Sequence, residues 1–319
     1  MGRFNSAHFF NFVSMENIPH YLLNSVTDMH YQLGLKSPAN PLVSVMRLEN
    51  IPAQNTSTPK TIVYNFYVVY LKKKYEGKVK YGYQYYDFDN GVISFFSPKQ
   101  KITIEENNGS QNVEGWMLVF HPDFIQGYGL AKKMKDFNFF SYATNEALHI
   151  SEKEENTVSG ILENLQEEIE NRIDGYTQEV IVSHIELLLN YCNRFYGRQF
   201  ITRKKASNDL LVKFEQLLDD YLNKDEIQKN GLPTVRYFAD KLNVSPNYLN
   251  DMLKNLTGQT TQQHLHHQLV EKAKELLSTT ELSVSEIAYQ LGFEYTQSFN
   301  KLFKNKTKVT PLEFRQSFN

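Results

Sequence analysis

Basic side chains gather near the end of this 319-residue chain, at a density that could bind phosphate. Four lysines fall within one short segment: Lys301, Lys304, Lys306 and Lys308. Local density of positive charge matters more for phosphate binding than net charge, which is −2 for the whole chain. Residues 201–319 hold 16 Lys and Arg against 14 Asp and Glu, whereas residues 1–200 hold 18 against 22. The C-terminal region is therefore net positive and the rest of the chain net negative, as a nucleic-acid-binding C-terminal region would need.

The cysteine and the histidines of this sequence do not occur in the patterns that catalysis or metal binding would need. The single cysteine, Cys192, lies among leucines, and we expect a buried, inert thiol. His264, His266 and His267 have no Cys or carboxylate alongside them, which favours a surface histidine patch over a metal site. The sequence has no Ser/His/Asp order, P-loop or glycine-rich dinucleotide fingerprint. We therefore expect no enzyme activity, metal or cofactor.

One motif occurs twice, about fifty residues apart, in the last ninety residues or so. The copies comprise Phe238–Val244 followed by Tyr248–Lys254, and Ile287–Phe293 followed by Ser298–Lys304. In each copy a small residue stands where two helices must cross closely, and a residue that can turn the chain follows it: Ala239 and Asn243, then Ala288 and Gly292. Apolar residues recur four positions apart on the second helix: Leu249 and Leu253, then Phe299 and Phe303. Each copy predicts a helix-turn-helix, and two copies imply two DNA-reading helices.

The segment between the copies predicts a rigid connector. Thr261–Ser278 places apolar residues on one face (Leu265, Leu269, Ala273 and Leu276). It should form a helix about 27 Å long at 1.5 Å per residue. Two reading helices that enter successive major-groove faces are separated by about 34 Å. We expect this helix to hold them on one side of a duplex while its apolar face serves as core.

Residues 42–120 predict a β domain. Its β-branched and aromatic runs are Ile62–Leu71, Tyr81–Phe88, Ile93–Phe96 and Trp116–Phe120, with turn signals at Asn90–Gly91 and Asn108–Gly109. Short strands at this spacing indicate a small sandwich or barrel. A short helix is expected before them, within Ile18–Leu35.

From Ser151 the periodicity becomes helical and predicts a helical hairpin. Its two apolar stripes are Val158, Leu162, Leu165 and Ile169, then Ile181, Ile185, Leu188, Cys192 and Phe195, with a break at Asp174–Gly175. The stripes could pack on the β domain or form a dimer seam. We favour the seam, through Ile181, Ile185, Leu188 and Cys192, because two stripes exceed what one small sheet needs for cover. Residues 201–207 are polar and predict a linker, and a helix capped by Ser207 or Asn208 follows.

Residues 208–319 resemble the DNA-binding domain of AraC/XylS-type transcription regulators. The family's second motif is matched at Glu286, Ile287, Ala288, Leu291, Gly292, Phe293, Ser298, Phe299, Phe303, Lys304, Thr310, Pro311, Phe314 and Arg315. Lys308 stands where the family has the glycine that ends the reading helix, whereas the first copy keeps it at Gly258. A lysine at a left-handed cap costs roughly 1 kcal/mol, so this helix end could be reshaped, or its charge could contact phosphate.

The resemblance implies which side chains face DNA. Bases would be read near the start of each second helix and one turn later, by Asn247, Asn250, Asp251, Thr296, Gln297, Asn300 and Lys301. Asn and Gln can pair with adenine, Lys with guanine, and Asp can accept from cytosine N4. Asp251 departs from the family, and a solvated charge is its alternative reading. The phosphate contacts would come from Ser245, Lys254, Lys304 and Lys306.

The resemblance extends to the first 200 residues, where many such regulators carry a cupin-like effector domain and a helical dimerisation element. Gly115–Phe124 looks like the segment that leaves such a barrel, but the β region lacks the His-x-His pair of metal-binding cupins, so His121 is expected to be structural. Aromatic residues could line a ligand cavity or form plain core: Tyr64, Phe66, Tyr83, Tyr85, Phe95 and Trp116.

We therefore expect an α+β chain: a cupin-like small β-barrel domain (1–150), a helical hairpin (151–200), a linker (201–207) and an all-α double helix-turn-helix DNA-binding domain (208–319). With no apolar run of about 18 residues and no signal stretch, it is expected in the cytoplasm. The function expected is a sequence-specific transcription regulator that binds double-stranded DNA as a homodimer, responds to a small-molecule effector and contacts RNA polymerase. The alternatives are a regulator without a ligand, controlled by a partner or by its own level, and a small-molecule-binding or enzymatic cupin domain with a DNA-binding tail.

Overall fold

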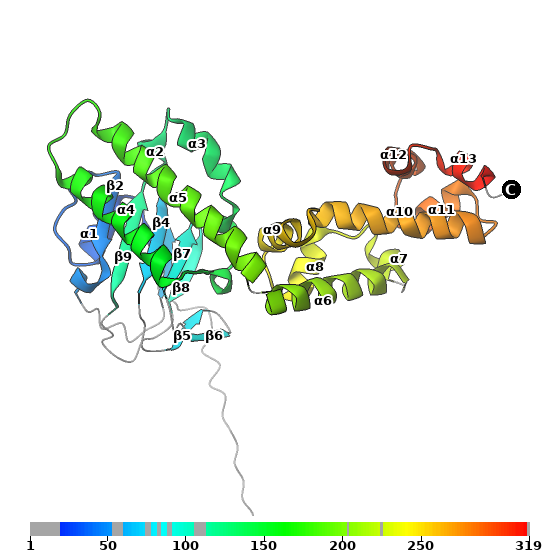
Figure 1. The fold of residues 1–319 in the computed structure, drawn as a ribbon, viewed down its shortest axis with the longest axis horizontal. Helices are drawn as coiled ribbons and strands as arrows, with labels where there is room; N and C mark the ends of the chain where they lie inside the picture. The colour runs from blue at the N-terminus through cyan, green and yellow to red at the C-terminus, as the bar shows by residue number, and fades with distance from the viewer. Residues whose placement is uncertain are drawn as a thin grey trace, which may run out of the picture.

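The computed structural model describes residues 20–52, 60–73, 78–81, 84–87, 91–104, 113–202, 204–223 and 226–317. A β domain covered by two long helices is followed by an elongated helical domain (Figure 1). The turn signals at Asn90–Gly91 and Asn108–Gly109 lie partly or wholly outside the described residues. No helix of the described part combines the length and the apolar character that a membrane crossing needs.

Two open sheets build the first domain. The larger has the order β10 (Leu148–His149), β7 (Val92–Phe96), β4 (Tyr67–Lys72), β9 (Gly115–Phe120) and β2 (Val43–Arg47), with neighbouring strands antiparallel. The smaller has the order β1 (His20–Leu23), β3 (Lys60–Tyr64) and β8 (Lys101–Ile104), in which β1 and β3 are parallel. A separate hairpin joins β5 (Lys78–Tyr81) and β6 (Gln84–Asp87). Among the described strands the pairing does not close into a barrel, and the sandwich alternative fits.

Alternation along the strands creates two cores. On β4, Val69 and Leu71 face the helices, whereas Val68 faces the smaller sheet. The second core also receives Val26 and Met29 from α1 (Val26–Gln32). This short helix lies within the expected range Ile18–Leu35, and β1 (His20–Leu23) precedes it.

The predicted strand Ile62–Leu71 is in fact two strands in different sheets. Asn65 divides it, since its backbone N–H donates to the carbonyl of Leu23 and its side chain donates to Asn24. The chain turns there, and β3 and β4 then lie on opposite sides of the core that contains Phe66. A run of β-forming residues carries no signal for such a turn beyond the asparagine itself.

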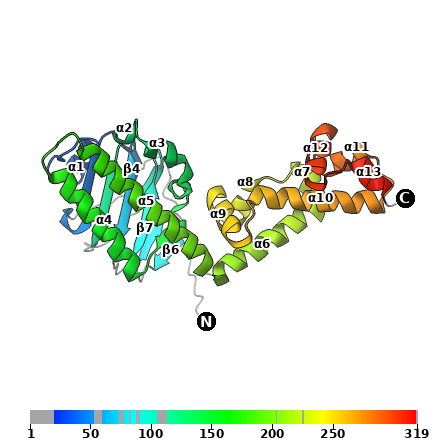
Figure 2. The same cartoon turned by 45° about the horizontal axis from the view of Figure 1, so that its top comes forward.

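Helices α4 (Glu152–Glu170) and α5 (Thr177–Thr202) form the predicted hairpin and cover the outer face of the larger sheet (Figure 2). The four expected seam residues, Ile181, Ile185, Leu188 and Cys192, are at most 1% exposed in the single chain. They pack on a face of five strands that needs both helices as cover, so they are not a dimer seam. Burial also raises the pKa of the Cys192 thiol, in agreement with an inert cysteine.

The described residues of the predicted linker belong to helices. Residues 201–202 end α5, and α6 (Lys204–Asn223) begins before the expected caps Ser207 and Asn208. Short helices join the sheet to the hairpin: α2 (Pro122–Ile125), α3 (Gly129–Lys133) and the 3-10 turns η3 (Met134–Asp136), η4 (Asn138–Ser141) and η5 (Thr144–Glu146); another turn, η2 (Leu48–Asn50), follows β2.

The second domain is all helical and is built along α10 (Thr261–Thr279). Before it come α6, α7 (Glu226–Asn230), α8 (Val235–Leu242) and α9 (Pro246–Thr257); after it come α11 (Val284–Gln290), α12 (Thr296–Thr307) and α13 (Pro311–Gln316). The apolar face of α10 is buried, as predicted, and its helix is about 28 Å long at 1.5 Å per residue. It carries α9 at one end and α12 at the other (Figures 1 and 2).

A comparison of two glycines tests the packing of the second turn. A Cβ at Gly292 (φ +81°) would lie 2.8 Å from the carbonyl carbon of Gly231, whereas one at Gly258 (φ +77°) would meet nothing within 4 Å. Gly258→Ala should therefore cost only the left-handed strain, about 1 kcal/mol. Gly292→Ala adds a backbone clash and should cost roughly 2–4 kcal/mol. Urea unfolding measures both, and equal losses would contradict the close approach.

Adjacent leucines of α5 test the corrected role of the hairpin. Leu188 is fully buried and Leu187 is 45% exposed. Leu188→Asp should lower the free energy of unfolding by several kcal/mol, because it buries an unpaired charge. Leu187→Asp should change it little. If the unaltered chain sediments as a dimer and the Leu188→Asp variant is folded but monomeric, Leu188 belongs to a dimer seam after all.

Candidate nucleic-acid interface

The first helix-turn-helix forms where the sequence predicts it. Thr234 caps α8 through the N–H of Tyr237, and Asn243 turns the chain with left-handed φ +56° and ψ +41°. Ser245 then caps α9 by accepting from the N–H of Tyr248. Leu249 and Leu253 face inward and are fully buried. The predicted turn and inner face are therefore confirmed.

The second helix-turn-helix repeats this construction at the far end of α10. Ser283 and Glu286 form a reciprocal capping box at the start of α11, and Gly292 makes the turn. Lys308 ends α12 with φ +71° and ψ −5°, close to the +77° and −1° of Gly258. The lysine therefore adopts the left-handed cap without reshaping the helix end.

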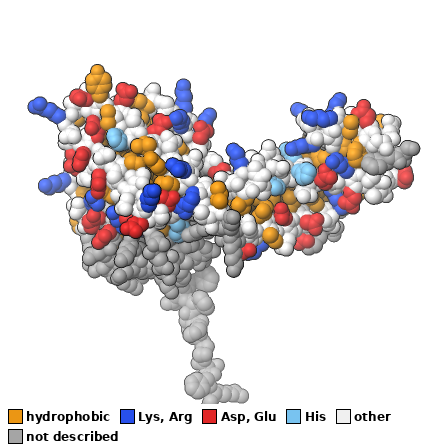
Figure 3. All heavy atoms as spheres, viewed as in Figure 1, with side chains coloured by type: hydrophobic (Ala, Val, Ile, Leu, Met, Phe, Trp, Pro, Cys, Tyr) orange, Lys and Arg blue, Asp and Glu red, His pale blue; other side chains and the backbone are white. Residues whose placement is uncertain are grey.

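The second reading helix presents its expected DNA-contacting side chains to solvent. Gln297, Lys301, Lys304 and Lys306 are exposed, and Thr296 and Asn300 are half-buried. Thr296, Asn300, Lys301 and Lys304 line a shallow depression together with residues from the starts of α11 and α13, none of them acidic. Lys and Arg side chains gather over this end of the molecule (Figure 3). Such a surface suits a polyanion.

The first reading helix presents its expected side chains to the other domain. Asn247 donates to Ser141 Oγ (2.6 Å), and Asp251 accepts from Asn138 Nδ2 (3.0 and 3.1 Å) and from the hydroxyl of Tyr142 (2.6 Å). The expected phosphate contact Ser245 donates its N–H and its hydroxyl to Glu146 (2.6 Å each). Lys254 remains exposed. The solvated-charge reading of Asp251 is wrong, because its carboxylate is held by the first domain.

The equivalent asparagines of the two copies have different surroundings. Asn250 Oδ1 accepts the backbone N–H of Thr261, the first residue of α10 (3.3 Å). At the equivalent place the second copy has Pro311, which has no N–H, and the buried Asn300 Oδ1 has no hydrogen-bond partner among the described residues. Asn250 is thus tied to the start of the next helix, whereas the carboxamide of Asn300 is not.

The histidines of α10 form no metal site. His264 Nε2 lies 2.8 Å from Thr257 Oγ1, and His266 Nε2 lies 2.8 Å from the side-chain amide of Gln262. Burial lowers the pKa of both rings, with Lys306 adding to the effect at His266. Within the described residues no cluster of metal-ligating side chains exists.

The four described members of the six aromatic residues expected around a ligand cavity do not converge. Tyr64 and Phe66 lie between the two sheets, whereas Phe95 and Trp116 lie on the helix side of the larger sheet. Tyr83 is outside the described residues, as is the side chain of Tyr85. The four described residues are at most 5% exposed and therefore serve as core, not as the lining of one pocket. His121 caps α2 by accepting from the N–H of Asp123, the structural role expected for it.

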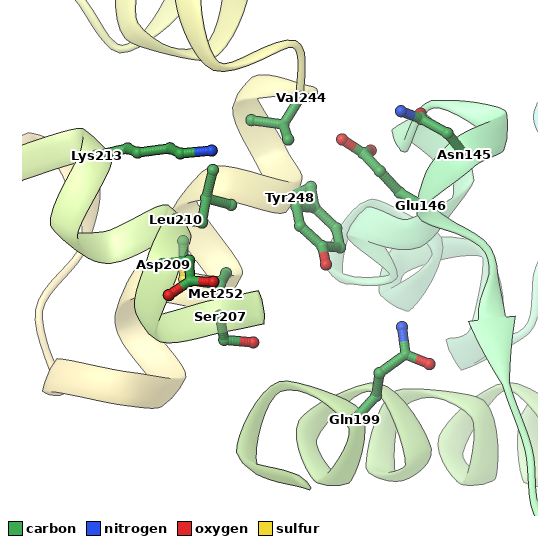
Figure 4. A pocket seen from close by; sticks show the side chains of 10 residues that line it. All are labelled: Asn145, Glu146, Gln199, Ser207, Asp209, Leu210, Lys213, Val244, Tyr248 and Met252. Carbon is green, nitrogen blue, oxygen red and sulfur yellow. The ribbon is translucent and has the colours of Figure 1, made fainter. Parts of the chain in front are cut away.

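The junction between the domains contains a pocket that the sequence did not indicate. Its volume is about 370 Å³, and it is lined by Asn145, Glu146, Gln199, Ser207, Asp209, Leu210, Lys213, Val244, Tyr248 and Met252 (Figure 4). Glu146 and Tyr248 reach it from opposite domains. Because these residues come from segments far apart in the chain, no local pattern could reveal their convergence.

Comparison with known proteins agrees with the geometry of the second domain. Residues 238–317 match the family model of a helix-turn-helix domain. The chain is 28% identical over 171 residues to the uncharacterized HTH-type transcriptional regulator YijO of Escherichia coli K12, with 54% of this chain and 56% of that protein covered. It is 31% identical over 154 residues to the HTH-type transcriptional activator RhaS of Escherichia coli O1:K1, with 47% and 50% covered.

The chain thus spans about half the length of the curated relatives it matches. Among solved structures, the C-terminal domain of the two-component response regulator yesN from Fusobacterium nucleatum is 36% identical, with 32% of this chain and 96% of that chain covered and a TM-score of 0.28. These relatives are transcription regulators, which are not enzymes. Residues 238–317 of this chain therefore form an AraC-type helix-turn-helix domain, in the region that the sequence motifs predicted.

Proposed function

We propose that this chain is a cytoplasmic transcription regulator that binds specific sequences in double-stranded DNA. The observation that carries the proposal is the pair of helix-turn-helix units at the two ends of α10. A connector of about 28 Å is of the order of the 34 Å between successive major-groove faces. One protein chain can then read two turns of groove from one side of the duplex.

Exposed side chains of α12 have the chemistry for both kinds of contact. Gln297 offers a carboxamide that matches adenine, and Lys301 offers a donor that matches guanine. Lys304 and Lys306 lie one turn further on, where their charges can neutralise phosphates. Base contacts specify the sequence, whereas phosphate contacts fix the position of the protein.

The first domain would control this binding in response to a small organic effector, without a metal. The pocket at the junction supports this role, because a ligand there would contact residues of both domains at once. The β domain has two packed cores, one on each face of the larger sheet, and its described aromatic residues belong to these cores and not to a ligand pocket. This packing favours a second candidate, a regulator that responds to a partner or to its own level. A small organic ligand that raises the melting temperature of the purified chain would support the effector-responsive regulator over the second candidate.

Two further partners belong to the proposal. Promoter-bound regulators of this type would contact RNA polymerase, and a second copy of the chain would double the number of reading helices. Because the inner face of α4 and α5 is occupied, a homodimer through these helices must use outward-facing residues such as Leu187. Sedimentation of the full chain at micromolar concentration measures its assembly state.

Alanine substitutions in α12 distinguish specific reading from general attraction to DNA. Gln297→Ala or Lys301→Ala should cost about 1–3 kcal/mol on the site selected from a random pool and relax the preference at one or two base pairs. Lys304→Ala or Lys306→Ala should weaken binding to all duplexes and reduce the salt slope by roughly one unit each. Lys132→Ala, in the first domain, is the control. A pool with no enriched sequence would contradict the proposal.

The paired asparagines should respond differently to the same change. Asn250→Ala leaves the N–H of Thr261 without its acceptor and should lower stability by about 1 kcal/mol. Asn300→Ala removes an oxygen that makes no hydrogen bond to the described residues, so the free energy of unfolding should change little while DNA preference relaxes. Thermal unfolding and competition binding measure the two effects. The idea fails if Asn300→Ala is the more destabilising change.

A further inference from the structure

One face of the first reading helix is engaged by a single segment of the first domain, residues 138–146. Ser141 accepts from Asn247, Asn138 and Tyr142 donate to Asp251, and Glu146 accepts from Ser245. These contacts cover the start of α9 and its next turn, which are the positions through which a reading helix meets base edges. The segment and DNA would therefore use the same face.

Glu146 holds the place that a DNA phosphate would take. Its two carboxylate oxygens accept the backbone N–H and the hydroxyl of Ser245, the residue that caps α9. The N-terminus of a reading helix with these two donors is a typical phosphate contact. Glu146 is 5% exposed and also accepts the N–H of Ala143, so its carboxylate is firmly oriented. Two anions cannot use the same pair of donors.

Asp251 gives the contact a second anchor. A carboxylate on the DNA side of a reading helix repels phosphates, but here it receives two hydrogen bonds from Asn138 and one from Tyr142. Burial, and then the nearby Asp251, raise the pKa of the Tyr142 hydroxyl, which keeps its proton available for donation. An acidic residue that weakens DNA binding thus strengthens binding to the first domain.

Aromatic packing extends the contact beside these hydrogen bonds. The ring of Tyr248 on α9 meets the edge of Tyr142 at 5.3 Å and of Phe200 at 5.2 Å between centroids. Gly197 of α5 lies close to Asn255 as well. The contact therefore combines hydrogen bonds to two carboxylates with aromatic packing along two turns of α9.

The second reading helix has no such cover among the described residues. It lies at the end of α10 remote from the first domain, and Gln297, Lys301 and Lys304 are exposed (Figures 1 and 2). Asp251 of the first copy corresponds to Lys301 of the second, so the residue that anchors one helix to the protein is replaced by a cation in the other. The two copies are unequal in charge and in access.

We propose that residues 138–146 are an intramolecular competitor of DNA for the first reading helix, with the Glu146 carboxylate in place of a phosphate. In this conformation the chain binds DNA through its second motif alone, and two-motif binding requires the segment to leave α9. This inference rests on the proposed function, because it assigns a regulated state to the same interface. A signal that separates Tyr142 and Glu146 from α9 would switch the length of DNA that is read.

Two conservative variants of the full chain, Tyr142→Phe and Glu146→Gln, test the inference from the first-domain side. Each keeps the shape of the side chain and removes a hydroxyl or a negative charge from the contact. Each should raise affinity for DNA about tenfold, equivalent to 1.4 kcal/mol. Selection from a random pool should then enrich two sequence blocks about one helical turn apart, where the unaltered chain enriches one. Tyr191→Phe is the matched control, since the Tyr191 ring packs on Phe195 of the same helix, α5.

The outcomes separate this inference from the proposed function. If both variants behave as Tyr191→Phe does while Gln297→Ala weakens binding, the competitor is disproved and the regulator stands. If the unaltered chain already enriches two blocks, the competitor is also disproved. If neither Gln297→Ala nor Lys304→Ala affects DNA binding, the proposed function fails. Misfolding of a variant is detected independently, because adding Lys304→Ala would no longer lower the DNA affinity of a misfolded variant.

Discussion

The burial of the apolar face of α10 is the constraint on which the second domain depends. Leu265 and Leu269 pack toward the first helix-turn-helix, whereas Leu276 and Leu277 lie near the second. Because one straight helix belongs to both units, neither can rotate without breaking contacts of the other. The separation of the reading helices is therefore a property of the core and not of a flexible linker.

The same core continues into the first domain through α9. Its inner face holds the helix-turn-helix together with Leu249 and Leu253, and its outer face packs on Tyr142 and Phe200 through Tyr248. A single helix thus contacts two domains, and in the proposed function its start also meets a third partner, DNA. The proposed competition between residues 138–146 and DNA arises because both would bind the same face of α9.

The sequence predicted the second domain closely because its signals are local. Turn residues such as Asn243 and Gly292 and the apolar spacing on α12 each determine structure within a few neighbouring residues. The first domain was predicted less well, since the cover that a sheet needs depends on how many strands join it. Five strands require both α4 and α5, which turned the expected dimer seam into interior.

The contacts of the reading helices were beyond reach of the sequence for a similar reason. Glu146 and Ser245 lie 99 positions apart, and Asn138 and Asp251 lie 113 apart, so no periodicity connects them. One signal was present: the acidic Asp251 on a face expected to meet phosphates, where its charge is unfavourable. A residue that opposes the expected partner indicates that another partner uses the same face.

Pro311 has a consequence for how a duplicated motif can change over time. In the first copy the carboxamide of Asn250 supports the next helix, so a substitution there acts on the amount of folded protein. In the second copy Pro311 has no N–H for Asn300 to accept, so the Asn300 carboxamide does not support the next helix. Under the proposed function, variation at position 300 can then alter which genes are controlled while the abundance of the protein is preserved.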